Sequence, residues 1–245
     1  GNAKFAFDLY GQILKSREGS NVFVSPASIS LALAMTWNGS SGTTREAMGK
    51  ALGLEGMPLE DANRAFAALL RDLQQIDPKV RLEIANALWT SGKIRLQEPF
   101  RKRLADSFRA TATSADFEDP ATVRAINAWV KDRTAGKIPE IVDGTIRDMI
   151  VILLNAVYFK AEWQTAFDPK KTREMPFHLA GGKDKKVPMM SRTAELDVLE
   201  TKTFRSVRLP YGKNGRCSLH LFVPQDLAEF HRDLTAANLD SWLQG

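Results

Sequence analysis

The 245-residue sequence contains a single cysteine, Cys217, and only three histidines. One cysteine cannot form an intramolecular disulfide and cannot supply a cysteine cluster for a metal ion. The histidines, His178, His220 and His231, do not pair at the spacing that places two metal ligands on one helix face. We therefore expect neither a metal site nor a bound cofactor.

The sequence also lacks an uninterrupted apolar run long enough to cross a bilayer. The longest candidate, residues 149–159, is bounded by Asp148 and Lys160. Residues 1–15 carry charged side chains in an amphipathic pattern, unlike the apolar block of a signal peptide, although a mature secreted chain would look the same after cleavage. A membrane partner is not expected.

Recognisable catalytic motifs are missing as well. The nearest approach is Gly39–Ser40–Ser41–Gly42, but a G-x-S-x-G nucleophile turn needs glycine where Thr43 stands. The sequence has no phosphate-binding P-loop, no dinucleotide fingerprint and no H-E-x-x-H zinc motif. These absences argue against an enzyme.

Positive charge is in slight excess, because 34 Lys and Arg residues stand against 29 Asp and Glu residues, a net charge of +5. The basic residues form small groups at 101–103, at 183–186 and between 205 and 216. Aromatic residues do not alternate with them, as they would on a platform that stacks bases. Solvated faces explain the charge best, nucleic acid is not expected as a partner, and an anionic polymer remains the alternative.

Hydrophobic periodicity and turn signals divide the chain into elements without an internal repeat or a linker. The spacing predicts helices over 3–15, 26–37, 59–76, 98–109, 121–135 and 226–243, and a short helix before Gly53 that is capped by Thr43 or Thr44. It predicts strands over 22–24, 80–89, 110–117, 149–163, 187–190, 196–200, 204–210 and 217–223. With 44% hydrophobic residues, the chain can bury a core, and we expect a single domain over residues 1–245.

The segment NVFVSPASISLALAM, residues 21–35, places serines at the start of a helix that is apolar on nearly every side. Serine at position 25 followed by Pro26 is a strong helix start, and Asn38–Gly39 is a left-handed stop signal. A helix that is apolar all round is predicted to be buried all round.

Two further polar residues lie in apolar surroundings and need hydrogen-bond partners. Ser28 lies three residues after Ser25, on the same side of the helix start, and Asn155 lies in the middle of the strand over 149–163. An unpaired polar group in an apolar interior costs about 1–3 kcal/mol. If the helix start lies beneath the strand, the hydroxyls and the amide can share one cluster. The alternative is that each side chain bonds to its own neighbourhood.

The long pattern in NVFVSPASISLALAMTWNGSSGTTREAMGKAL, followed by LLNAVYFKAEWQTAF, VPMM and LPY, resembles the serpins. The resemblance is collinear over nearly the whole chain. It implies an α+β fold with three β-sheets and a helical cluster, in which a large central sheet lies over a buried helix.

The resemblance also implies roles for single residues. Ser25, Ser28 and Asn155 match the family's shutter, the region where the strands of the central sheet part, and Trp163 matches the breach at the top of that sheet. The helix over 121–135 matches the one that lies across the sheet face. As a weaker suggestion, a polyanion that activates some serpins would contact Arg64, Arg71, Lys79 and Arg81, although these are scattered in the sequence.

Serpin inhibitors offer an exposed loop to a serine or cysteine protease, and after cleavage the loop inserts as a new strand and traps the protease. The resemblance therefore implies a protease inhibitor whose partner is such a protease, with a non-inhibitory carrier or chaperone as the alternative. The sequence stops at Gly245, before the reactive loop and the last strands, so no scissile bond can be named, and a C-terminal segment of the same protein is expected to complete the fold. Most serpins are extracellular, which is the expected location, and an intracellular one stays open.

Overall fold

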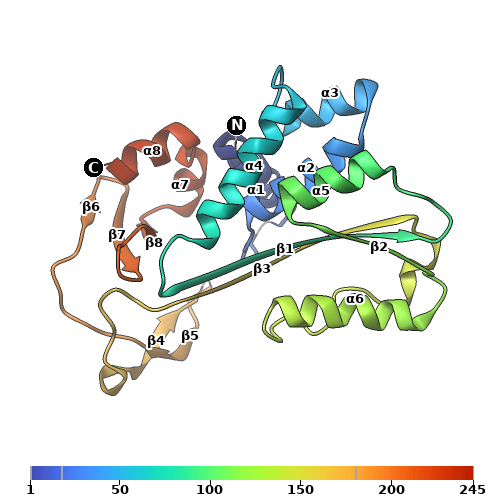
Figure 1. The fold of residues 1–245 in the computed structure, drawn as a ribbon. Helices are drawn as coiled ribbons and strands as arrows, with labels where there is room; N and C mark the ends of the chain where they lie inside the picture. Colours follow the sequence, from blue (N-terminus) through green and yellow to red (C-terminus); the bar gives the residue numbers. More distant parts are fainter. Residues whose placement is uncertain (1, 18, 180, 245) are drawn as a thin grey trace. The chain divides into compact units, whose positions relative to one another are not determined.

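The structure is a computed structural model that describes residues 2–17, 19–179 and 181–244. The chain divides into two compact units (Figure 1). The first consists of the described residues up to Gln75, Arg81–Phe159 and His231–Gln244, and the second consists of Ile76–Val80 and Lys160–Phe230. The single domain expected over residues 1–245 stays a prediction.

The first unit contains most of the helices and one sheet. Its elements are α1 (Asn2–Ser16), α2 (Pro26–Gly39), α3 (Gly42–Ala51), α4 (Leu59–Gln74), β1 (Val80–Ser91), α5 (Glu98–Phe108), β2 (Thr111–Ala115), α6 (Pro120–Arg133), the short 3-10 helix η1 (Gly144–Asp148), β3 (Val151–Ala161) and α8 (Ala236–Gln244). The sheet has the order β2-β1-β3, and β1 and β2 are parallel, with Ala87 opposite Thr111. β3 runs the other way, since Ser91 at the end of β1 donates its N–H to the carbonyl of Ile150, just before β3 (2.8 Å).

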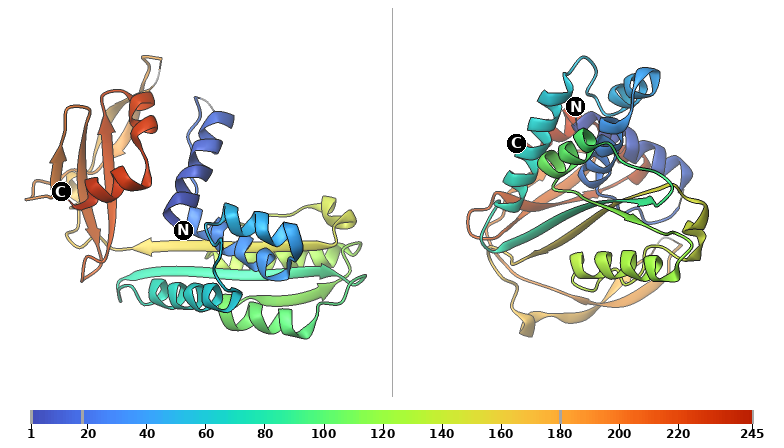
Figure 2. Two further views of the ribbon diagram at one scale, coloured as in Figure 1. Left: turned by 90° about the horizontal axis from the view of Figure 1, so that it is seen from above. Right: turned by 45° about the vertical axis from the view of Figure 1, so that its right-hand side comes forward.

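The two faces of this sheet are covered by different helices (Figure 2). On one face, Leu88 of β1 and Leu153 of β3 pack into a core with the buried residues of α2, α4 and α5. On the other face, Ala87 and Ile152 pack against α6. Because both faces are covered, the apolar residues of β3 do not alternate with polar ones, as the sequence predicts.

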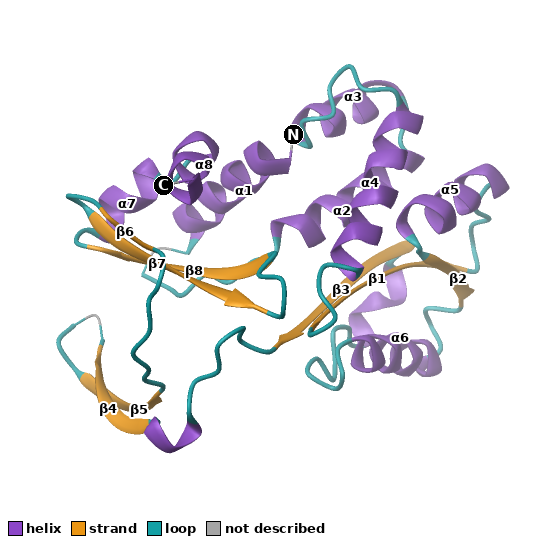
Figure 3. Cartoon of the chain, turned by 60° about the vertical axis from the view of Figure 1, so that its left-hand side comes forward, coloured by secondary structure: helices purple, strands orange, loops and turns teal. Residues whose placement is uncertain are grey.

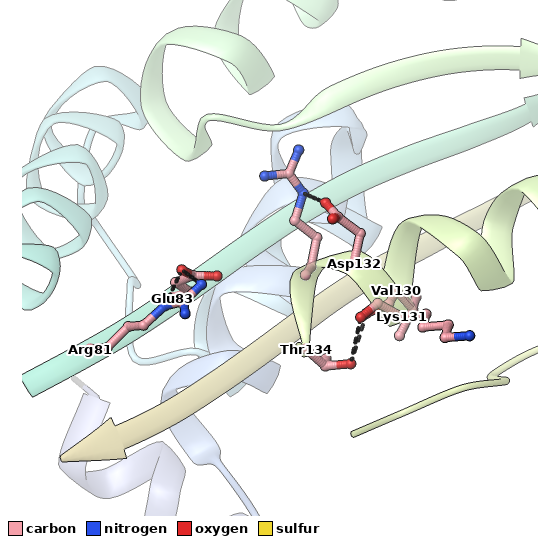
Figure 4. Close-up of polar contacts among 7 residues, drawn as sticks. Arg81, Glu83, Val130, Lys131, Asp132 and Thr134 are labelled. Atoms are coloured by element: carbon pink, nitrogen blue, oxygen red, sulfur yellow. Dashed lines mark hydrogen bonds and ion pairs between the residues drawn. The ribbon is translucent and has the colours of Figure 1, made fainter. Parts of the chain in front are cut away.

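Helix α6 lies across one face of the sheet, and its C-terminal end is held by local hydrogen bonds (Figure 4). Ile126 and Val130, both fully buried, are its contacts with the sheet. After the last turn, the hydroxyl of Thr134 donates to the carbonyl of Val130 (2.8 Å) and accepts the N–H of Ile138 (3.1 Å). The helix predicted over 121–135 is confirmed to within two residues.

Helix α2 is less buried and two residues longer than the sequence predicts. Met35 is fully buried, but Leu33 is 37% exposed, so the helix has an open side. The helix runs through Gly39 without a left-handed residue at that point, and Ser40 ends it in an extended conformation. Asn38 continues the helix because its buried amide bonds reciprocally with that of Asn63 in α4, at 2.8 and 2.9 Å.

The second unit is made of strands (Figure 3). It contains the 3-10 helix η2 (Pro169–Lys171), the hairpin of β4 (Arg173–His178) and β5 (Asp184–Met189), a second antiparallel sheet of β6 (Val198–Glu200), β7 (Phe204–Tyr211) and β8 (Cys217–Pro224), and most of α7 (Leu227–Asp233). The strands predicted over 187–190, 196–200, 204–210 and 217–223 correspond to β5 to β8. The fold of the described residues is therefore α+β with three sheets, as predicted.

Four local predictions are wrong. Residues 22–24 are not a strand, and Phe23 is fully exposed there, because a strand needs a neighbour and none of the described residues pairs with it. The helix over 226–243 is two helices, since Thr235 caps α8 by accepting the N–H of Asn238 (3.2 Å). Ser41 stands at the N-cap of α3 in place of Thr43 or Thr44, and the exposed strand β4 was not predicted.

Within the described ranges, no helix combines the length and the hydropathy that a membrane crossing requires.

Candidate functional site

Four groups from four elements form a chain of hydrogen bonds beneath the sheet of the first unit. The hydroxyl of Ser28 in α2 donates to Oδ1 of Asn155 in β3. Nδ2 of Asn155 donates to Oδ1 of Asn86 in β1 (2.7 Å), and Nδ2 of Asn86 donates to the backbone carbonyl of Phe108 in α5 (2.8 Å). Asn86 is 2% exposed, so this chain joins two strands and two helices in an interior where unpaired polar groups are costly.

The local sequence explains why these side chains meet. Side chains alternate along a strand, so Asn86 faces the same side as Leu88, and Asn155 the same side as Leu153, both toward the helices. The carbonyl of Phe108 is available because α5 ends there, where Arg109 takes a left-handed conformation (φ 51°). Ser28 lies in the first turn of α2, where the helix start reaches β3.

The structure brings together two of the three predicted shutter residues. Ser28 and Asn155 are bonded to each other, in the shared arrangement that the sequence left as one of two alternatives. Ser25 occupies the N-cap, and its carbonyl accepts the N–H of Ile29 (3.2 Å), but its exposed side chain makes no capping hydrogen bond. The role of all three in a sheet that opens stays a prediction.

Asn86 is the member of the chain that sequence reasoning missed. It lies in the apolar run IANALW, where an asparagine in a covered strand needs a partner as much as Asn155 does. The same signal that singled out Asn155 was therefore present in β1.

Trp163, which the sequence assigns to the breach, follows β3 in the chain and lies in the second unit. Its ring stacks on Tyr211 with centroids 4.3 Å apart and meets Phe167 edge to face at 5.7 Å. Backbone bonds fix this contact, since Gln164 donates to the carbonyl of Pro210 (2.9 Å) and Gly212 donates to that of Glu162 (2.8 Å). The role of Trp163 in loop insertion stays a prediction.

The turn that follows Tyr211 is fastened by Asp77, which is 5% exposed. Its carboxylate accepts the backbone N–H groups of Lys213 and Asn214, each at 2.8 Å, and that of Lys79 at 2.8 Å. Burial by itself raises the pKa of Asp77, but the three N–H groups and the charge of Lys213 outweigh it and lower the pKa.

Asp77 is expected to make stability depend on pH in the acid range. Its pKa in the folded state lies below the ordinary value of 3.8, so its stabilising effect is complete above that value and is lost as the pH falls through the lower, folded-state pKa. Urea midpoints of the native protein and of Asp77→Asn should differ by a constant amount well above pH 3.8, and the difference should narrow as the pH falls below that value. Asp8→Asn, which removes an exposed i,i+4 partner of Lys4, is the control and should leave the midpoint nearly unchanged. A constant difference between native protein and Asp77→Asn over the whole range would contradict this account.

Three of the four basic residues named for a polyanion already face carboxylates. Arg64 pairs with Asp61, Lys79 pairs with Glu162 at 2.7 Å, and Arg81 pairs with Glu83 (Figure 4). Arg71 is exposed on α4. A polyanion would have to compete with these ion pairs, so the structure offers this prediction little support. Among the described residues, no group of three or more His, Cys, Asp or Glu side chains could hold a metal ion.

Comparison with known proteins identifies the family. Residues 1–245 match the family model Serpin (serine protease inhibitor). The chain is 32% identical over 236 residues to alpha-1-antiproteinase of Rattus norvegicus, which covers 95% of this chain and 57% of that protein. It is 34% identical over 245 residues to corticosteroid-binding globulin of Oryctolagus cuniculus, covering 98% of this chain and 63% of that protein. The chain belongs to the serpin family, whose description names inhibitors rather than catalysts.

Solved structures agree with this assignment. Human glycosylated kallistatin superposes with a TM-score of 0.92 at 28% identity, covering 99% of this chain and 67% of that one. Reactive-loop-cleaved human thyroxine-binding globulin gives a TM-score of 0.92 at 25% identity, covering 99% and 74%. The relatives thus include both protease inhibitors and hormone-binding globulins, and the chain spans about three fifths of the length of the curated relatives.

Proposed function

We propose that the protein containing this chain inhibits a serine-type or cysteine protease by trapping it through insertion of a cleaved loop into the sheet that holds β3. The observation that carries the proposal is the hydrogen-bond chain from Ser28 through Asn155 and Asn86 to Phe108. It ties β3 to β1 and to the helices beneath, as a latch on a sheet that opens would. This hydrogen-bond chain supports the part of the proposal that concerns the sheet, and the class of protease has to be found by experiment.

The sheet geometry gives insertion a driving force. β3 stands at the end of the strand order β2-β1-β3, so within the described residues its outer edge has no neighbour. A strand of about a dozen residues added there would gain on the order of 10 kcal/mol, at roughly 0.5–1.5 kcal/mol net per hydrogen bond. The uninserted form would then persist because its conversion is slow.

The matched part covers 57–66% of the curated relatives first compared, and their remaining residues lie outside the match. We propose that a further segment of the same polypeptide carries the reactive loop and pairs with this fold. We also propose an extracellular location, since relatives of Bos taurus and Homo sapiens are named plasma serine protease inhibitor.

The protein that contains this chain is expected to form a covalent complex with at least one member of a panel of trypsin-like, chymotrypsin-like, elastase-like and papain-like proteases. The complex should survive SDS because the trap stops at the acyl-enzyme, and it should run as one band at the sum of the two masses less the C-terminal fragment that cleavage of the peptide bond releases. A protease whose catalytic serine or cysteine is replaced by alanine is the control and should give no such band. Cleavage of the protein by the whole panel without any complex would contradict inhibition.

The alternative is a non-inhibitory carrier, and the likeness to corticosteroid-binding globulin favours it most directly. A carrier should bind a steroid or an iodothyronine saturably and should be cleaved by proteases without trapping them. Fluorescence titration with cortisol and with thyroxine, run on the same preparation as the protease panel, separates the two functions.

A further inference from the structure

The first unit contains a hollow of about 660 Å³ that the proposed inhibition does not use. It lies between the edge strand β2, the end of β1 and the first turn of α5, and these elements lie close together in Figure 1. Its size is that of a pocket for a small molecule.

The floor of the hollow carries two hydroxyl groups. In the parallel register Thr90 of β1 stands opposite Ser114 of β2, two residues after the pair of Leu88 and Ala112. Leu88 packs with α5, so by alternation Thr90 and Ser114 point to the same side, under α5 and into the hollow. Thr90 is only 2% exposed as a residue, and no hydrogen bond of its hydroxyl to another described residue is found. Its oxygen is not among the fully buried atoms that lack a partner, and a ligand in the hollow that Thr90 lines could bond to it.

The rim of the hollow is positively charged. Arg95 in the loop before α5 forms no ion pair with the residues that the structure describes, and Arg101 has only the long contact with Glu98 at 3.7 Å. The N-terminal end of α5, an 11-residue helix, also opens here, and the side chain of its N-cap residue Gln97 makes no capping bond. A helix N-terminus attracts anions, and a guanidinium group binds oxyanions with two hydrogen bonds.

We propose that this hollow binds a small ligand that carries one oxyanion group on a hydroxyl-rich body, such as a phosphorylated or sulfated sugar. Arg95, Arg101 and the start of α5 hold the oxyanion. The hydroxyls of Thr90 and Ser114, which can both donate and accept, bond to the hydroxyl groups of the body. The carboxylate of Glu98 repels the anion, so the three charged side chains of the site, those of Arg95, Glu98 and Arg101, carry a net charge of +1.

Isothermal titration calorimetry on the protein that contains this chain tests the site with four probes: glucose 6-phosphate, glucose 6-sulfate, glucose and inorganic phosphate. We expect saturable binding of the two anionic sugars, and the ratio of their dissociation constants shows which oxyanion is preferred. Glucose and inorganic phosphate should bind more weakly. Inorganic phosphate binding as tightly as glucose 6-phosphate would overturn the role of the hydroxyl floor. The absence of saturable binding of both anionic sugars would overturn the site.

Variants of single side chains locate the site. Thr90→Val keeps the shape and should weaken binding of glucose 6-phosphate about fivefold. Arg95→Gln, at an exposed position, should weaken it about tenfold or more, and Glu98→Gln should strengthen it about threefold. Lys102→Gln is the matched control, since Lys102 lies beside Arg101 but pairs with Asp106 at 3.0 Å, and it should bind as the native protein does. Unchanged affinity in both Thr90→Val and Arg95→Gln would refute the assignment, whatever the outcome of the protease panel.

Discussion

Asn155→Leu is expected to lower the free energy of unfolding by about 2–4 kcal/mol. Leucine has a similar volume but cannot accept from Ser28 or donate to Asn86, so both are left without their partner in a largely apolar interior. Each buried polar group that loses its partner costs about 1–3 kcal/mol, although Ser28, near the helix start, can recover part of this by turning to water. Chemical unfolding followed by tryptophan fluorescence measures the loss.

A matched pair of serine variants controls this experiment. Ser28→Ala removes the donor to Asn155 and should cost about 1 kcal/mol. Ser25→Ala, at an exposed position three residues earlier, should change stability by less than about 0.5 kcal/mol. If the proposed function holds, Asn155→Leu should also lose monomer on mild heating, as seen on native gels, because β3 is tied less firmly to β1. Equal effects of the two serine variants, or a native-like Asn155→Leu, would contradict the role of the chain.

Gly212→Ala is expected to lower the melting temperature by about 5–10 °C. Gly212 has a φ of +72°, where a side chain is strained, and a Cβ added there would lie 2.5 Å from Oδ1 and 2.6 Å from Oδ2 of Asp77. The carboxylate would have to move and release the N–H groups of Lys213 and Asn214. The same turn carries the backbone bonds that hold Trp163 on Tyr211, so fluorescence in the second unit should change as well.

The control for this variant lies three residues along the same turn. Gly215 has a φ of +65°, but a Cβ added there meets nothing nearer than Nη2 of Arg208 at 3.6 Å, an ordinary contact. Gly215→Ala should therefore show only the cost of the left-handed backbone, about 2–4 °C. If both variants melted at the same temperature, the close approach of Asp77 would not matter.

Local signals predicted most of the elements correctly, because helices and strands in this chain follow their own periodicity. The start of α2 at Pro26 and the long strand β3 are examples. The errors arose where pairing with another segment of the chain determines the local structure. Residues 22–24 have strand-like composition without a paired neighbour in the described chain, and β4 is a strand through its pairing with β5 although its residues are exposed.

The site was predictable only in part, for the same reason. The rule that an asparagine in an apolar strand needs a partner singled out Asn155 and would have found Asn86, but it could not pair them across 69 positions. Asp77 gave no signal, because Asp-Pro is an ordinary turn sequence and its partners Lys213 and Asn214 lie 136 and 137 residues away.

The carbonyl of Phe108 dictates the orientation of every amide above it. A backbone carbonyl can only accept, so Asn86 must turn its NH₂ group toward α5 and its oxygen toward β3. Asn155 must then turn its NH₂ group toward Asn86 and its oxygen toward α2, so the hydroxyl of Ser28 has to donate its proton to that oxygen. An aspartate carboxylate at 155 would face the side-chain oxygen of Asn86, so the exchange of a single group would replace this hydrogen bond with a repulsion between two acceptors, where leucine would only remove the bond.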